Sequence, residues 1–85
     1  MKHARQDYDR IQDPSGKIPE DEPVFLLRAQ DTSAPRVVLE WVRVNMELGG
    51  DRNLIEAAIK QIARMHEWQR EHGHKIADGD GGPAA

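Results

Sequence analysis

Apolar and polar positions follow helical spacing through the second half of the chain, and the first such stretch predicts a helix over residues 32–48. Asp31 or Ser33 supplies its N-cap and Gly49 ends it. Two apolar stripes run along it: Val37, Trp41, Val44 and Leu48 on one line, and Ala34, Val38, Val42 and Met46 on the other. The two stripes together are wider than one neighbouring helix can cover.

A single apolar face predicts a second helix over residues 51–72, with Asp51 as its N-cap and Gly73 just beyond its end. Its members are Leu54, Ile55, Ala58, Ile59, Ile62, Met65 and either Trp68 or Gln69. Because the link between the two helices is short and rich in glycine, we expect antiparallel neighbours, an αα-hairpin. The low-complexity residues 79–85 are expected to form a flexible tail.

The first part of the chain has a different pattern. Residues 1–22 show no apolar periodicity, and "DPSG" at 13–16 has the chemistry of a type I turn, which predicts an irregular, extended arm. The stretch "PVFLLRAQ" at 23–30 begins with β-branched and aromatic residues and favours a short strand from Val24 to Arg28. Such a strand needs a partner, from residues 1–20 or from a second copy of the chain.

Length and composition narrow the classes of protein. The 85 residues fit one small domain, which we place at 1–78, and the absence of cysteine removes disulfides and thiolate metal sites. Oligomerisation is the remaining way to stabilise so small a core. We therefore expect an α+β, mainly α, homo-oligomer.

Charge and hydropathy argue against nucleic acid and membranes as partners. The net charge is −3 and no segment is net basic, which argues against binding to duplex nucleic acid. No apolar run of membrane-spanning length occurs, and the polar N-terminus does not resemble a signal peptide. We therefore expect a cytoplasmic protein with no membrane partner.

No combination of residues resembles a catalytic motif, so we predict that the chain is not an enzyme and needs no cofactor. The histidines near the end of the second helix lack the i, i+4 pairing of helical metal sites, since Arg70 stands four residues after His66. A solvated helix end is the simpler interpretation. The acidic run Glu20–Glu22 is interpreted in the same way, as a solvated approach to the strand.

Two groups of residues remain candidates for binding. An anion or nucleotide pocket could be built from Arg5, Tyr8, Arg10, Lys17 and Arg28, because arginine matches phosphate and an aromatic ring can stack on a base. Alternatively, Tyr8 packs the arm on the body and Arg28 pairs with an acid such as Asp31. The oligomer interface is expected to include Val24, Phe25, Leu27, Val38, Trp41 and Val42.

The stretch "RIQDPSGKIPEDEPVFLLRAQDTSAP", followed by a helical hairpin that ends in "MHEWQ", resembles a group of small, mostly uncharacterised accessory proteins encoded in bacteriophage genomes. The resemblance implies expression in the host bacterial cytoplasm and carries over no catalytic residue. It favours a protein that opposes host defence, by sequestering a nucleotide-derived immune signal in pockets between subunits or by binding a host defence protein. The alternative is a structural or assembly role with no small-molecule ligand.

Overall fold

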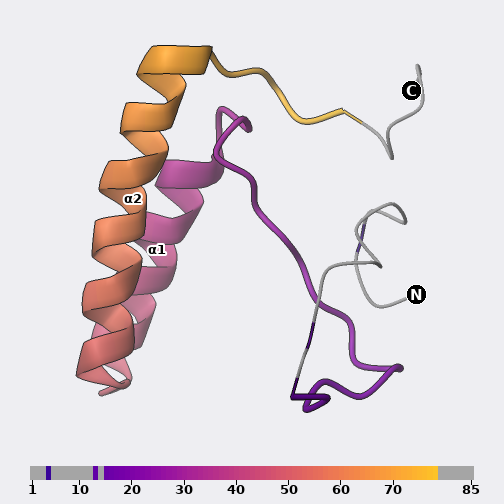
Figure 1. The fold of residues 1–85 in the computed structure, drawn as a ribbon. Coiled ribbons are helices and arrows are strands. Elements are labelled where there is room, and N and C mark those ends of the chain that lie inside the picture. Colours follow the sequence, from indigo (N-terminus) through magenta and orange to yellow (C-terminus); the bar gives the residue numbers. More distant parts are fainter. Residues whose placement is uncertain (1–3, 5–12, 14, 79–85) are drawn as a thin grey trace. The chain divides into compact units, whose positions relative to one another are not determined.

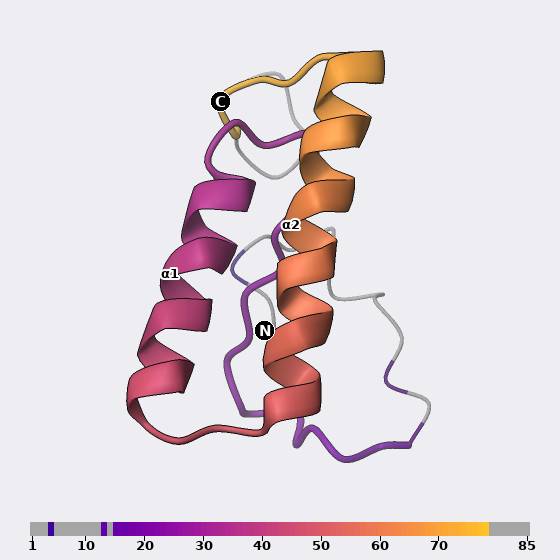
Figure 2. The ribbon, with the colours of Figure 1, turned by 90° about the vertical axis from the view of Figure 1, so that its left-hand side faces the viewer.

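The computed structural model describes Ala4, Asp13 and residues 15–78, and the regular structure of this part is two α-helices with no strand or sheet (Figure 1). Helix α1 spans Ala34–Glu47 and helix α2 spans Arg52–His72. They lie side by side and run in opposite directions, joined by a short turn (Figure 2). The predicted helical hairpin is thus confirmed. The predicted flexible tail and most of the predicted arm lie outside the described residues.

Helix α1 begins two residues later than predicted, at Ala34. The Thr32 amide donates to the Lys75 carbonyl at 2.8 Å, which ties the residues before the helix to the segment after α2. The first helical amide, that of Ala34, donates to the Asp31 carbonyl at 3.0 Å. Ser33 occupies the N-cap position, but its side chain makes no capping hydrogen bond.

The turn between the helices has a well-defined geometry. The Gly50 amide donates to Asn45 O at 2.8 Å and the Gly49 amide donates to Met46 O at 3.2 Å, which is the Schellman pattern. Gly49 has a positive φ of 71°, where a side chain is disfavoured. Asp51 then caps α2, because its Oδ1 accepts a hydrogen bond of 2.8 Å from the Leu54 amide. The cap of α2 is the one that the sequence predicts.

The core of the hairpin is small. The buried apolar side chains are Ala34, Pro35, Val42, Ile55 and Met65, with Val38, Ala58 and Ile62 half-buried. No large side chain of the described residues is completely buried. The stripe that contains Ala34, Val38 and Val42 therefore packs against α2, and the other stripe remains exposed. Val38 and Val42, expected at an oligomer interface, contribute to this core.

The described residues before Arg28 belong to a second compact unit, together with Asp78, whereas Arg28–Ala77 form the hairpin unit. The predicted turn is present, since the Gly16 amide donates to Asp13 O and the Ile18 amide donates to Asp13 Oδ2, both at 2.9 Å. The predicted strand is not: Val24 makes only an isolated bridge, and no ladder continues to Arg28. A strand requires neighbouring backbone along its length, and the described chain does not supply it.

Candidate functional site

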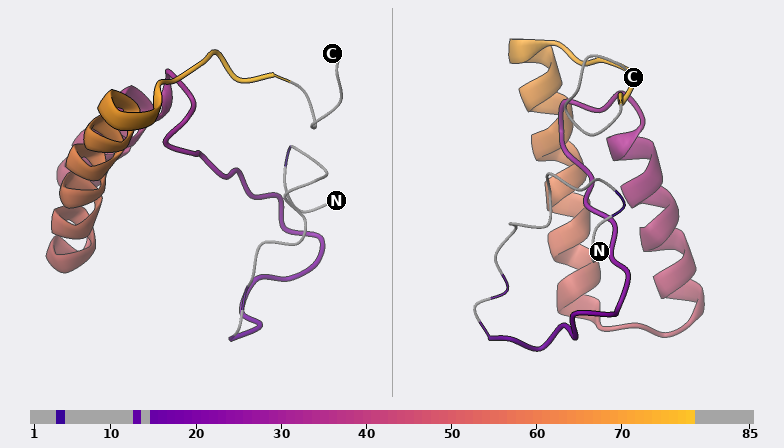
Figure 3. Two further views of the ribbon diagram at one scale, coloured as in Figure 1. Left: turned by 45° about the horizontal axis from the view of Figure 1, so that its top comes forward. Right: turned by 90° about the vertical axis from the view of Figure 1, so that its right-hand side faces the viewer.

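The segments that flank the hairpin are joined at one end of it, and we call residues 28–33 and 73–77 the clasp (Figure 3). Asp31 and Lys75 form a parallel bridge, in which the Lys75 amide also donates to Gln30 O at 2.8 Å. The Thr32 hydroxyl lies 2.9 Å from Nδ1 of His74. These contacts close the open end of the hairpin with backbone hydrogen bonds.

Gln69 connects the clasp to α2. Its Nε2 donates to the carbonyl oxygens of Ala29 and Asp31, at 2.9 and 3.1 Å. The sequence places Gln69 or Trp68 on the apolar face of α2, and the structure shows why an amide stands there. Gln69 is half-buried and supplies a donor to Ala29 O and a second donor to Asp31 O, which also accepts from the Ala34 amide.

Asp31 is the buried carboxylate of the clasp, with 6% of its surface exposed. Its Oδ2 accepts a hydrogen bond of 3.3 Å from the Arg28 backbone amide, and its own amide donates to Arg28 O at 2.9 Å. The two residues are therefore in contact through the backbone of a tight turn. Asp31 shapes the loop that leads into α1.

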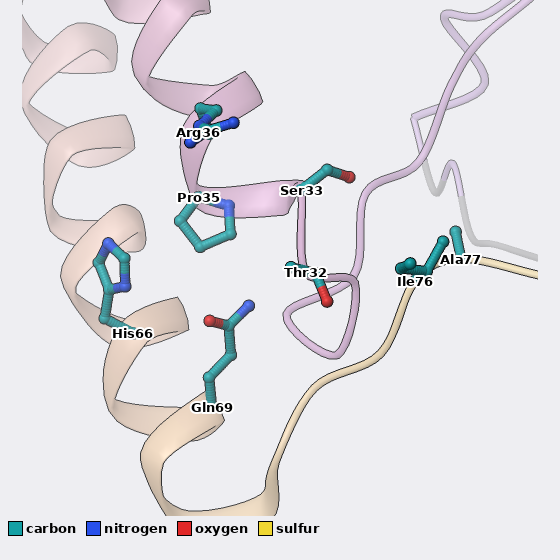
Figure 4. A pocket seen from close by; sticks show the side chains of 8 residues that line it. All are labelled: Thr32, Ser33, Pro35, Arg36, His66, Gln69, Ile76 and Ala77. Atoms are coloured by element: carbon teal, nitrogen blue, oxygen red, sulfur yellow. The ribbon is translucent and has the colours of Figure 1, made fainter.

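A cavity of about 520 Å³ lies between the clasp and the two helices (Figure 4). Its lining residues are Thr32, Ser33, Pro35, Arg36, His66, Gln69, Ile76 and Ala77. His66 and Gln69 project from α2 toward the start of α1, and the clasp supplies the remaining wall. The lining residues include an arginine, a histidine, a glutamine and two hydroxyl residues beside apolar ones, and none of them is acidic.

Arg36 is an unusual residue at this place in a helix. It lies in the first turn of α1, where the helix dipole favours negative charge, and this turn contains no acidic residue. No carboxylate of the described part of the chain lies within ion-pair distance of it, and Glu40, four residues further on, pairs with Arg43 at 3.5 Å. A cation at the positive end of a helix is a sequence signal that sequence analysis did not use.

The structure does not bring the five predicted ligand-binding residues together. Arg5, Tyr8 and Arg10 lie outside the described residues, Lys17 belongs to the N-terminal unit, and Arg28 belongs to the hairpin unit without lining the cavity. His66, predicted to be part of a solvated helix end, lines the cavity instead. Arg36 and Ser33 were not predicted as site residues.

A second feature of the hairpin is an exposed apolar surface. It consists of six large side chains from both helices, which we call the apolar face: Val37, Trp41, Val44, Leu48, Leu54 and Trp68. Each leaves between 37% and 77% of its surface exposed. On the outer side of this face, Trp68 stacks on His72 with ring centroids 4.4 Å apart.

The apolar face and the cavity lie on opposite flanks of the hairpin. A smaller hollow beside the turn is lined by Met46 of α1 together with Ile55 and Ile59 of α2, and the cavity joins Pro35 to His66. At 100° per residue, these positions share one flank of each helix. The members of the apolar face fall on the other flank of each helix.

No protein-family model, curated protein or solved structure matches this chain. Among the described residues, no helix is long and apolar enough to cross a membrane. In the same part of the chain, no three His, Cys, Asp or Glu side chains lie together in a way that could hold a metal ion. The cavity and the apolar face are therefore the features of the hairpin that bear on function.

Proposed function

We propose that this chain is a non-enzymatic binding protein that acts as a homo-oligomer and sequesters a nucleotide-derived signalling molecule. In the context implied by the resemblance to phage proteins, it works in the cytoplasm of the host bacterium against a defence pathway. The observation that carries this proposal is the apolar face, because six large apolar side chains on one flank of the hairpin remain exposed beside a small core.

The size of the apolar face suits self-association. A fully exposed large side chain presents about 150 to 250 Å², so the exposed fractions of the six residues leave on the order of 500 Å² per chain. Two such faces in contact bury about 1,000 Å², which reaches the lower limit of specific interfaces. The predicted strand at Val24 to Arg28 would then add backbone pairing between copies.

Light scattering of the purified protein tests the oligomer. Val44 and Leu39 are matched residues of α1, exposed by 41% and 40%, but Val44 belongs to the apolar face and Leu39 does not. We expect Val44→Asp to shift the protein to monomer, because it buries a charge in the interface, and Leu39→Asp to leave the mass unchanged. A monomeric wild-type protein, or equal behaviour of the two variants, contradicts the proposal.

The ligand is tested by thermal unfolding in the presence of cyclic dinucleotides and ADP-ribose-type signals. A ligand at about 100 times its dissociation constant stabilises the protein by about 2.7 kcal/mol. For a domain of this size that raises Tm by about 10 to 20 °C. If none of these signals raises Tm, the sequestration proposal is wrong.

The second candidate is an assembly protein, or an oligomer that binds a host protein, with no small-molecule ligand. It is favoured by the apolar face as well, since that surface alone explains why copies associate. The two candidates differ in one result: the assembly protein is oligomeric in light scattering and shows no change in Tm with any of the signals.

A further inference from the structure

We propose that the cavity at the clasp binds the phosphate group of a small phosphorylated molecule, with Arg36 and His66 as its contacts, and that each chain contains a complete site. This inference rests on the proposed function only for the class of ligand. The inferred site is not a pocket between subunits, because all of its lining residues come from the hairpin unit of one chain.

Charge is the first argument. The chain has 15 acidic and 12 basic residues, yet the lining of the cavity contains an arginine and a histidine and no acid. Asp31, which precedes Thr32 in the sequence, is buried and accepts a hydrogen bond from the Arg28 amide. An arginine in a cavity whose lining contains no acid indicates an anionic ligand.

The donors are the second argument. The guanidinium of Arg36 presents a planar set of N–H groups that matches two phosphate oxygens, and no ion pair with a described residue competes for it. The Ser33 hydroxyl makes no capping bond, so it remains available at the same helix start. The positive end of α1 adds to the attraction of a phosphate.

Volume and apolar lining are the third argument. A cavity of about 520 Å³ is larger than a phosphate ion and falls in the range of about 300 to 1,000 Å³ that small-molecule sites occupy. Pro35, Ile76 and Ala77 supply apolar surface for the uncharged part of the ligand. A phosphate monoester with an apolar or planar substituent, such as a nucleotide, fits this combination.

The position of the cavity determines the stoichiometry. Since the apolar face lies on the opposite flank of the hairpin, self-association through that face leaves the cavity open. We therefore expect one binding site per chain, in the oligomer and in a monomeric variant alike.

Calorimetric titration of the full chain with adenosine 5′-monophosphate and with inorganic phosphate tests the site. Arg43 is a matched control for Arg36, because it lies two turns further along the same side of α1 and its ion pair is with Glu40, with both side chains largely exposed. We expect Arg36→Ala to weaken binding of the nucleotide by about 10- to 100-fold, the loss of one charge-assisted contact. Arg43→Ala should bind as the wild type does, and Arg36→Lys should lose only part of the affinity.

His66→Gln provides a second variant in the same titration. It keeps the size and polarity of the side chain but removes its capacity for positive charge, and we expect weaker binding with an unchanged circular dichroism spectrum. If inorganic phosphate and the nucleotide fail to bind the wild type, or if Arg36→Ala binds as Arg43→Ala does, the site is refuted.

The failure of this inference can be separated from the failure of the proposed function. If a cyclic dinucleotide raises Tm equally in the wild type and in Arg36→Ala, the protein sequesters its signal elsewhere and only the inferred site is wrong. If the nucleotide binds in an Arg36-dependent way while no immune signal raises Tm, the site is correct and the sequestration proposal is wrong.

Discussion

Removal of the Gln69 amide is the sharpest test of how the clasp is held. In Gln69→Leu the side chain keeps its approximate volume and loses both donors, so Ala29 O and Asp31 O lose the hydrogen bonds of 2.9 and 3.1 Å. Each such bond contributes about 1 kcal/mol. The Asp31 carbonyl still accepts from the Ala34 amide, so the additional cost falls on Ala29 O alone.

We expect Gln69→Leu to lower the free energy of unfolding by about 2 kcal/mol, which is a decrease in Tm of about 8 to 16 °C for a domain of this size. Gln69→Glu should be less stable still, because a carboxylate of the same shape has no donor and faces two carbonyl oxygens. Thermal unfolding followed by circular dichroism measures both, at one protein concentration, since self-association would alter Tm.

Gln61 is the control for these variants. It also lies on α2, but it is exposed and only accepts a hydrogen bond of 3.4 Å from Arg64. Gln61→Leu should therefore change Tm little in the monomeric Val44→Asp background, where self-association does not contribute. Hydrogen exchange adds a local measurement: in Gln69→Leu the Thr32 and Lys75 amides should lose protection before those in the middle of the helices do. If Gln69→Leu and Gln61→Leu unfold at the same temperature, the assigned role of Gln69 is wrong.

Three further substitutions test the hairpin by chemical denaturation. Asp51→Ala removes the cap on the Leu54 amide and should cost about 1 kcal/mol, whereas Asp51→Asn should be nearly neutral; equal losses would contradict the cap. Gly49→Ala places a side chain at a φ of 71° and should lower the free energy of unfolding by about 1 kcal/mol. Unchanged stability would contradict the role assigned to this glycine. Val42→Ala, at a position only 3% exposed, should cost about 2 kcal/mol, and Val44→Ala much less in the monomer.

The sequence predicts the hairpin well because the signals for it are local. Apolar spacing of three and four residues defines both helices, and Asp51 and the two glycines of the turn mark where one ends and the other begins. Even the width of the apolar stripes on the first helix is informative, since one stripe faces α2 and the other remains exposed.

The clasp could not be predicted in the same way. Its central bonds join the backbone of residues 30–32 to that of Lys75, and backbone groups are the same in every sequence. The one side-chain signal was Gln69, a polar residue at a position of the apolar face of its helix. The strand expected after Pro23 does not form within the described part of one chain, because the β-branched and aromatic composition of a segment does not provide it with a neighbouring strand.

The candidate site was missed for a related reason. The arginines predicted for the site come from the arm and from the expected strand, whereas the cavity is lined by Arg36 from the start of α1 and His66 from the second half of α2. These residues are 30 positions apart, and only the antiparallel packing of the helices brings them to one place. The charge of Arg36 at the positive end of a helix was the signal available in the sequence.

Because the cavity and the apolar face lie on opposite flanks of the hairpin, substitutions in each can show whether the ligand binds between subunits or in the cavity. If the ligand binds between subunits, Val44→Asp removes binding together with the oligomer. If it binds in the cavity, Val44→Asp gives monomers that still bind one ligand each, and Arg36→Ala gives oligomers that do not. In that second case the double variant Val44→Asp/Arg36→Ala should lose association as Val44→Asp does and ligand binding as Arg36→Ala does. The two free-energy changes should add, because sites on opposite flanks with no shared partners are energetically independent. A large coupling between the two substitutions would instead place the bound ligand at the contact between copies.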